Sequence, residues 1–197
     1  MPSLDMIYKE QIIPEFLKAG YKNAMAVPKI TKVIVNVGIG KNRDNEKYVN
    51  LVKSNLAAIT GQIPVITKSR LSISGFKVRE GDSVGLKVTL RGKKMYDFLS
   101  KLTNIALPRL RDFRGLNPKS IDRNGNFTIG VKEHLVFPEI AHEADNIHGL
   151  EITMVSTSKN AQDTEKLITM LGFPFFKKEV SPSIPLGGTQ GREKING

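Results

Sequence analysis

The stretch VGLKVTLRGKKMYDFLSKLTNI, residues 84–105, changes its hydrophobic period in the middle and gives the clearest view of the fold. In residues 84–91 apolar side chains alternate with polar or small ones, which predicts a strand with one face toward a core. The apolar set is Val84, Leu86, Val88 and Leu90, and the opposite set is Gly85, Lys87, Thr89 and Arg91. The apolar residues Met95, Leu99, Leu102 and Ile105 then follow at helical spacing. This stripe predicts an amphipathic helix that must stop before Pro108.

Upstream of this stretch the same reasoning predicts a strand and two helices. KVIVNVGIG, residues 32–40, is rich in β-branched residues and ends in two glycines, as a strand does. A helix capped by Asp44 or Asn45 and stopped by Gly61 should follow. Its apolar face would be Val49, Val52, Leu56 and Ile59. A helix over residues 5–19, with apolar Met6, Ile13, Phe16 and Leu17, should be kinked or divided by Pro14.

Downstream, residues 108–126 are full of Gly, Pro, Asn and Arg and predict an extended surface loop. Strands are expected over 126–131 and 150–156, followed by a helix that Gly172 ends. Residues 180–197 are rich in Pro, Gly and Ser and predict a disordered tail. The length of 197 residues and 40% hydrophobic content favour a single domain, over residues 1–179.

Net charge indicates the class of partner. Thirty Lys and Arg against nineteen Asp and Glu give +11, with a pI near 9.8. Such an excess is typical of a protein that binds a polyanion, above all nucleic acid, although a merely soluble basic protein is the simpler alternative. The absence of Cys excludes disulfides and thiolate metal sites and agrees with a cytoplasmic location. Neither a signal peptide nor a membrane-spanning segment is predicted.

Enzyme motifs fail one by one. Gly38 to Lys41 follows a strand, but the spacing is wrong for a Walker loop, and Arg43 stands where the dinucleotide fingerprint requires a third Gly. His142 and Glu143 begin a zinc-peptidase pattern until Asn146 takes the second ligand position. We therefore expect no enzyme, no metal, no cofactor and no small-molecule substrate. The alternative from a different functional class is an enzyme that binds phosphate groups through Gly38 to Lys41.

Residues 67–81, TKSRLSISGFKVREG, combine cations, small residues and one aromatic side chain. Lysine and arginine neutralise phosphates, serine hydroxyls bond to phosphate or ribose, and an exposed Phe76 beside Gly75 offers a stacking plane. The cations are Lys68, Arg70, Lys77 and Arg79. The segment is predicted to be an RNA-binding loop, unless Phe76 is a core residue and the charges are its solvated rim.

Two further groups of polar residues suit RNA. Asn36 interrupts an apolar run, and Lys87 and Thr89 lie on the polar side of the later strand. If the two strands are neighbours, they form a polar platform flanked by Lys32 and Arg91, although Asn36 is equally a candidate for a buried, satisfied amide. The segment PRLRDFRGLNPKS, residues 108–120, carries Arg109, Arg111, Arg114 and Lys119. It would meet RNA or an acidic protein, or be an ordinary solvated loop.

Five motifs, in this order, carry a family resemblance: VNVGIG (35–40), KSRLSISGFKVREG (68–81), VTLRGKKMYDFL (88–99), PRLRDFRGL (108–116) and GNFTIGVKEHLVFPEI (125–140). Together they resemble the bacterial L-five family of large-subunit ribosomal proteins, over about residues 1–178. The resemblance implies an α+β fold: one two-layer domain with an antiparallel sheet, helices on one face and long basic loops. It also implies a place in the central protuberance of the large subunit, bound to 5S rRNA, with 23S rRNA as a further candidate partner.

The resemblance also assigns roles to individual residues. Asn36, Gln62 and Thr89 look like the family's polar contacts to 5S rRNA, joined here by the cations Lys32, Lys68, Arg70, Lys87 and Arg91. The loop Ser74 to Gly81 would reach the peptidyl-site (P-site) tRNA through Ser74, Gly75, Phe76, Lys77 and Arg79. Arg109, Arg111 and Arg114 would face a small-subunit protein of the S-thirteen family across an intersubunit bridge.

Departures from the family pattern are few. Leu71 stands where a basic residue is common, and Asn124 alters a turn that is usually rich in Gly and Arg. The first should weaken one phosphate contact and the second should change turn geometry. A different RNA-binding protein that shares the sheet is the rival within the binding class, and it would bind unrelated structured RNA as well as 5S rRNA.

Overall fold

The computed structural model describes residues 3–40, 42–111, 113–140 and 146–176. Its centre is a five-stranded sheet in the order β2-β3-β1-β5-β4, in which every neighbouring pair is antiparallel. The strands are β1 Ile30–Gly38, β2 Val65–Lys68, β3 Ser83–Leu90, β4 Phe127–Val131 and β5 Leu150–Ser156. The predicted α+β class with one antiparallel sheet is confirmed.

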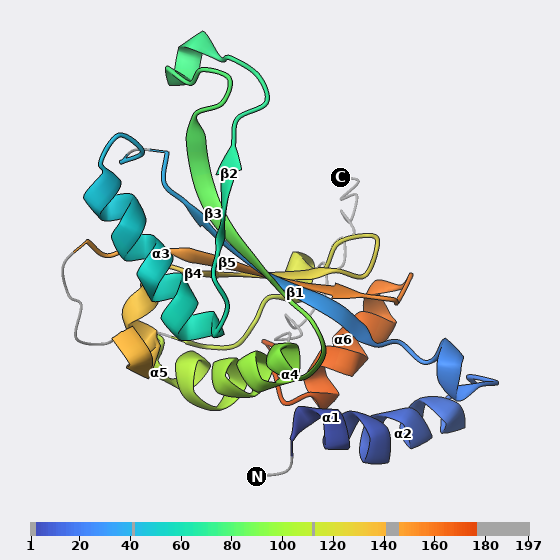
Figure 1. Cartoon of the computed structure of the whole chain (residues 1–197). Coiled ribbons are helices and arrows are strands. Elements are labelled where there is room, and N and C mark those ends of the chain that lie inside the picture. The colour runs from blue at the N-terminus through green and yellow to red at the C-terminus, as the bar shows by residue number, and fades with distance from the viewer. Residues whose placement is uncertain (1–2, 41, 112, 141–145, 177–197) are drawn as a thin grey trace, which may run out of the picture.

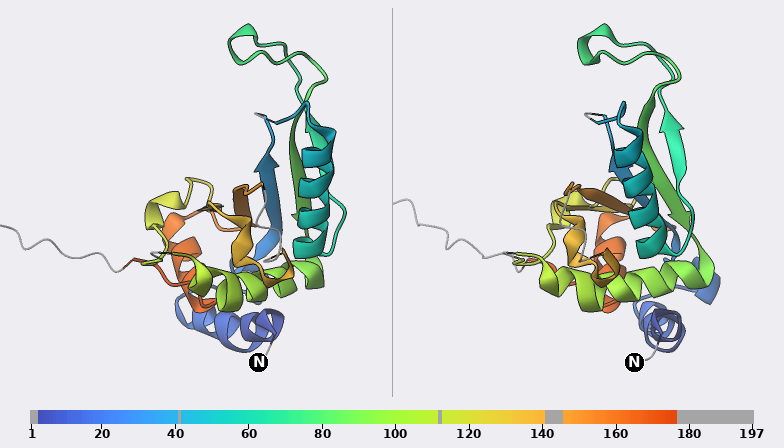
Figure 2. Two further views of the ribbon diagram at one scale, coloured as in Figure 1. Left: turned by 90° about the vertical axis from the view of Figure 1, so that its left-hand side faces the viewer. Right: turned by 60° about the vertical axis from the view of Figure 1, so that its left-hand side comes forward.

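Helices make up the second layer. They are α1 Leu4–Ile7, α2 Ile13–Lys18, α3 Glu46–Thr60, α4 Gly92–Lys101, α5 Leu107–Arg109 and α6 Ala161–Met170. The alternate residues Val33, Val35 and Val37 of β1 are fully buried, as are Leu86, Val88 and Leu90 of β3. This alternation places the hydrophobic core on one side of the sheet only. Helices α1, α2 and α4 gather at one end of the sheet, opposite the end from which the β2–β3 connection projects (Figures 1 and 2).

The two helices that contain proline behave differently from each other: the first is divided into α1 and α2 near Pro14, as predicted, whereas the helix at Pro108 continues through the proline. A π-helical turn, Leu102–Ala106, precedes Pro108, and α5 then runs to Arg109; another, Tyr8–Ile12, lies between α1 and α2. Proline has no N–H to donate, so a wider turn before it accommodates the missing bond. The prediction that the helix stops before Pro108 was therefore wrong.

The wider turns also rotate the apolar stripes. Ile105 is 40% exposed, whereas Ala106 and Leu107 beside it are buried. In the first helix the buried residues are Leu4, Tyr8, Ile12 and Phe16, while Met6 and Leu17 are exposed. Both expected stripes were thus partly wrong. The extra residue of a π-helical turn moves the side chains after it, such as Leu17, around the helix axis, whereas Met6 precedes the turn and lies off the buried row that begins at Leu4 and Tyr8.

The other elements agree with their sequence signals. The side chain of Asn45, rather than that of Asp44, caps α3 by accepting from the Tyr48 N–H at 3.3 Å. Gly61 ends this helix with a φ of +65°, a conformation that favours glycine. Strand β5 has the predicted bounds, and β4 differs by one residue. The predicted tail, residues 180–197, lies outside the described residues.

Candidate nucleic-acid interface

The face of the sheet opposite the core, here called the open face, carries a row of polar side chains. Strand β1 lies between β3 and β5, so that Asn36 stands opposite Lys87 on one side and Glu151 on the other. One step along, Ile34 lies between Thr89 and Thr153. Residues in register share a face of an antiparallel sheet. The expected platform of Asn36, Lys87 and Thr89 is therefore assembled.

Asn36 is oriented by its neighbours. Its Nδ2 donates to Oε2 of Glu151 at 3.3 Å. The side chain is half-buried, so the alternative of a fully buried amide is wrong. Glu151 had no place in the expected site, although its alternation with buried Leu150 and Ile152 in β5 would have placed it on the open face. Because the Glu151 carboxylate accepts from Nδ2 of Asn36, the amide oxygen of Asn36 is the group that can accept a hydrogen bond from RNA.

Gln62 and two threonines extend the polar row. Nε2 of Gln62, which precedes β2, donates to the backbone carbonyl of Thr89 at 3.4 Å. The hydroxyls of Thr128 and Thr153 lie 3.1 Å apart on β4 and β5. Cations flank this row: Lys87 and Arg91 are exposed and Lys32 is half-buried. The predicted contacts Asn36, Gln62 and Thr89 thus belong to one continuous surface.

The connection between β2 and β3, residues 69–82, forms a projecting hairpin arm. The sequence did not predict strand β2, because this strand has only four residues and lies at the edge of the sheet with no buried face. The arm continues the pairing of its two flanking strands: the Ser69 N–H donates to the Asp82 carbonyl at 2.8 Å, and Ile73 pairs with Val78. It extends well beyond the rest of the fold (Figure 1). Predicted residues Ser74, Gly75, Phe76, Lys77 and Arg79 all lie on this arm, as does Arg70, while Lys68 ends β2.

The tip of the arm is exposed and apolar as well as basic. Phe76 is 76% exposed, which contradicts the alternative that it is a core residue. Leu71 and Ile73 are also exposed, so Leu71 adds apolar surface to the arm. An aromatic plane beside cations suits stacking on an unpaired base.

Arg43 holds the arm to the body of the protein. Its guanidinium donates to the backbone carbonyl of Lys77 and lies 3.8 Å from Asp82 and 3.6 Å from Asp44. Only 17% of its side chain is exposed. In the sequence, Arg43 was noted only because it replaces the third Gly of a dinucleotide-binding motif. No local pattern linked it to residue 77, which is 34 positions away.

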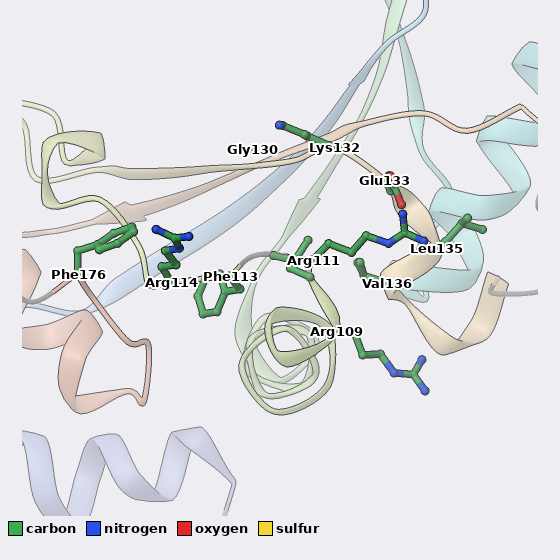
Figure 3. Close-up of a pocket in the computed structure, with 12 residues that line it drawn as sticks. Arg109, Arg111, Phe113, Arg114, Gly130, Lys132, Glu133, Leu135, Val136 and Phe176 are labelled. Atoms are coloured by element: carbon green, nitrogen blue, oxygen red, sulfur yellow. The ribbon is translucent and has the colours of Figure 1, made fainter.

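The third basic cluster borders a cleft of about 440 Å³, which lies beside the end of β4 (Figure 3). Arg109, Arg111 and Arg114 line it together with Lys132. Its apolar lining is Leu110, Phe113, Leu135, Val136 and Phe176. Lys119, predicted with this cluster, sits in the next turn, Pro118–Ser120, and does not line the cleft. Asp112 lies outside the described residues.

Two histidines pack against each other inside the fold. His134 and His148 are buried with their rings stacked at 4.0 Å, and the backbone N–H of His148 donates to Nδ1 of His134 at 3.2 Å. His142 lies outside the described residues. Within the described ranges, no three His, Asp or Glu side chains are grouped as metal ligands would be. Nor does any helix in those ranges have the length and apolar character to cross a membrane.

Asn124 belongs to a turn organised by Asp122. The backbone N–H groups of Asn124 and Asn126 donate to Oδ1 of Asp122 at 2.9 and 2.7 Å, and the Asn126 amide donates to Oδ2. The side-chain and backbone hydrogen bonds from Asn126 hold the pKa of Asp122 below its usual value. Asn124 contributes its backbone to this turn, so the departure from the family pattern is compatible with an ordered turn.

An uncovered polar sheet face, a projecting basic arm and a net charge of +11 define a structural RNA-binding protein. Two family matches agree: residues 23–79 match "Ribosomal protein L5", and residues 83–175 match the C-terminus of the same ribosomal family. The chain belongs to the ribosomal protein L5 family. Members of this family are structural, non-enzymatic components of the large ribosomal subunit.

Individual relatives support this assignment over nearly their whole length. The large ribosomal subunit protein uL5 of Halothermothrix orenii is 49% identical over 170 residues, which cover 85% of this chain and 95% of that protein. The uL5 protein of Carboxydothermus hydrogenoformans is 48% identical over 177 residues, covering 89% and 99%. That of Alkaliphilus oremlandii is 45% identical over 179 residues, covering 90% and 100%.

Proposed function

We propose that this chain anchors 5S rRNA in the large subunit through the open face of its sheet. One observation carries the proposal: Asn36, Lys87 and Thr89 lie on one face of neighbouring strands that no described helix covers, and Gln62 bonds to the Thr89 carbonyl beside them. Amide and hydroxyl groups at fixed spacing can bond to sugars and base edges of an irregular RNA loop. The flanking cations Lys32 and Arg91 would neutralise phosphates.

We further propose that the hairpin arm contacts P-site tRNA. Its exposed tip would place Phe76 against a base or ribose, with Lys77 and Arg79 on nearby phosphates. The arm and the open face are separate surfaces, so loss of one contact should leave the other intact.

The cluster of Arg109, Arg111 and Arg114 is proposed to form an intersubunit bridge with a small-subunit protein of the S-thirteen family. These cations border a partly apolar cleft rather than the polar sheet face. Arginine with apolar surface is the usual composition of a protein–protein contact.

Filter binding of 5S rRNA to the full chain tests the main proposal. Asn36→Ala and Thr89→Ala should each weaken binding about tenfold, since each removes a polar contact while circular dichroism stays unchanged. Gln162→Ala, on the exposed side of α6, is the matched control and should bind normally. If both sheet variants bind as the unaltered chain does, the open face is not the RNA site. Equal affinity for an unrelated structured RNA would favour a general RNA-binding protein instead.

Salt dependence tests the electrostatic part separately. If about six phosphates are neutralised, affinity should fall roughly a thousandfold between 50 and 200 mM salt. A complex whose affinity does not change with salt would contradict this mechanism.

A further inference from the structure

We propose that the cleft beside β4 receives an extended acidic peptide of a partner protein, which pairs with β4 as an added strand. The proposal rests on the bridge function proposed above and specifies the chemistry of the partner. Its basis is the direction of the backbone groups of β4, the composition of the cleft and its charge.

Strand β4 is an edge strand with one side unpaired over most of its length. The sheet order places β5 on one side of it, and of the described residues only Ile121 pairs with the other side, at Phe127. Edge strands expose unpaired N–H and C=O groups that can pair with another chain. Partners that bind in this way add a strand to the sheet.

The local hydrogen bonds show which residues face the free edge. Both backbone groups of Asn126 bond to Asp122, away from β5: its carbonyl accepts at 2.8 Å and its N–H donates at 2.7 Å. Backbone groups alternate in direction along a strand, so those of Thr128 and Gly130 also face the free edge. The close Thr128–Thr153 side-chain pair agrees, since residues that do not exchange backbone bonds approach most closely.

The free edge opens into the cleft at Gly130. This residue is exposed, and a Cβ built on it would meet nothing within 4 Å. Phe113 and Leu135 line the same cleft (Figure 3), so an alternate side chain of the added strand would find an apolar pocket.

Charge selects the occupant. Of the described residues that line the cleft, Arg109, Arg111, Arg114 and Lys132 are cationic and only Glu133 is anionic. Figure 3 shows Arg111 extended toward Glu133, with Arg114 on the opposite side of Phe113. A segment that carries carboxylates on either side of one apolar residue complements this lining. RNA would satisfy the cations, but it lacks a peptide backbone to pair with the edge and an aliphatic side chain for the pocket.

Amide exchange by NMR on the full chain tests the geometry. The probe is the capped peptide Glu-Val-Glu-Phe-Glu-Val-Glu. In the free protein the amides of Ile129 and Val131 should be protected and that of Gly130 should exchange freely. On addition of the peptide the exchange of the Gly130 amide should slow at least about tenfold, because it gains a hydrogen bond. An unchanged Gly130 amide at millimolar peptide overturns the proposal.

Two substitutions at one position test the backbone contact. Gly130→Pro removes the outward N–H without removing a bond to β5, and should weaken peptide binding about tenfold. Gly130→Ala keeps the N–H and should bind within twofold. A peptide in which Lys replaces each Glu should bind at least about tenfold more weakly. Three results would each overturn strand addition. The two variants could bind the peptide equally well, the Lys peptide could bind as well as the Glu peptide, or oligouridine could displace the bound peptide.

The underlying bridge is tested by a different readout. Ribosomal subunits carrying Arg111→Glu should associate more weakly if the cluster forms a bridge. Unaltered association would defeat the bridge, whereas equal peptide binding by the two Gly130 variants defeats only the strand addition. Should Gly130→Pro fail to fold, the amide exchange of the unaltered chain still decides.

Discussion

The guanidinium of Arg43 donates a hydrogen bond to the backbone carbonyl of Lys77, the residue at which the hairpin arm turns back. Lys77 has a φ of +51°, a left-handed conformation that non-glycine residues rarely adopt. The arm is otherwise held by pairing between its own two sides. Arg43 therefore connects the arm to the β1–α3 loop and orients its tip.

Replacing Arg43 should loosen the arm without unfolding the protein. In Arg43→Ala the amides of Ile73 and Val78, which pair across the arm, should exchange about tenfold faster, since a charge-assisted hydrogen bond is lost. Amide exchange by NMR measures this effect. Arg123→Ala, at an exposed turn, is the control and should leave these two amides unchanged. Equal exchange in both variants would show that the arm is rigid without Arg43.

Phe76→Ala should separate function from stability. The side chain contacts solvent, so the free energy of unfolding should change by no more than about 0.5 kcal/mol. Affinity for 5S rRNA should be nearly unchanged, while crosslinking of the arm to P-site tRNA should fall. Phe127→Ala, which removes a fully buried ring from β4, should cost about 3–5 kcal/mol in the same denaturation assay. A comparable loss in both variants would place Phe76 in a packed environment.

Alkaline pH should reveal the buried Tyr8 hydroxyl. Burial raises the pKa of Tyr8 to about 12, and the hydroxyl donates to the Pro28 carbonyl at 3.2 Å. Because the folded pKa lies above the unfolded value of about 10, this contribution to stability is complete below pH 10. It is lost as the pH rises from 10 toward 12.

The control for this effect is Tyr8→Phe. The variant should be about 1 kcal/mol less stable at neutral pH, where the hydrogen bond is missing, and its stability should fall less steeply above pH 10. Burial also raises the pKa values of Tyr21 and Tyr96, so part of the alkaline decline should remain. Identical curves for the variant and the unaltered chain would contradict the assignment to Tyr8.

Gly125 combines a positive φ with close packing. A Cβ there would lie 2.6 Å from the Ser158 carbonyl oxygen and 2.8 Å from the Thr164 hydroxyl, at a φ of +75°. Gly61 has a similar φ of +65°, but a Cβ there would meet nothing within 4 Å. In denaturant titrations Gly61→Ala should therefore cost about 1 kcal/mol, from backbone strain alone. Gly125→Ala should cost at least about 2 kcal/mol more, from the added overpacking. Similar costs would mean that the Ser158 segment moves aside easily.

Much of the fold could be predicted where the signal is local. Alternation in residues 84–91 predicted a strand, a further strand was predicted over residues 150–156, and Asp44 or Asn45 with Gly61 marked the two ends of α3. The same rules failed at Pro108, because a π-helical turn depends on whether packing around the helix stabilises the wider backbone. Strand β2 was missed for a related reason: it has no buried face, so pairing with β3 rather than hydrophobicity defines it.

The candidate site divides in the same way. Side-chain alternation alone placed Lys87 and Thr89 on one face of a strand, and the composition alone indicated a polyanion as partner. That Asn36 lies between Lys87 and Glu151, that Arg43 reaches Lys77, and that Arg111 and Gly130 line one cleft were decided by the tertiary structure. Short-range order follows from the periodicity of neighbouring residues along the chain. Contacts between distant segments follow from the strand order and from how the helices cover the core, which no local pattern encodes.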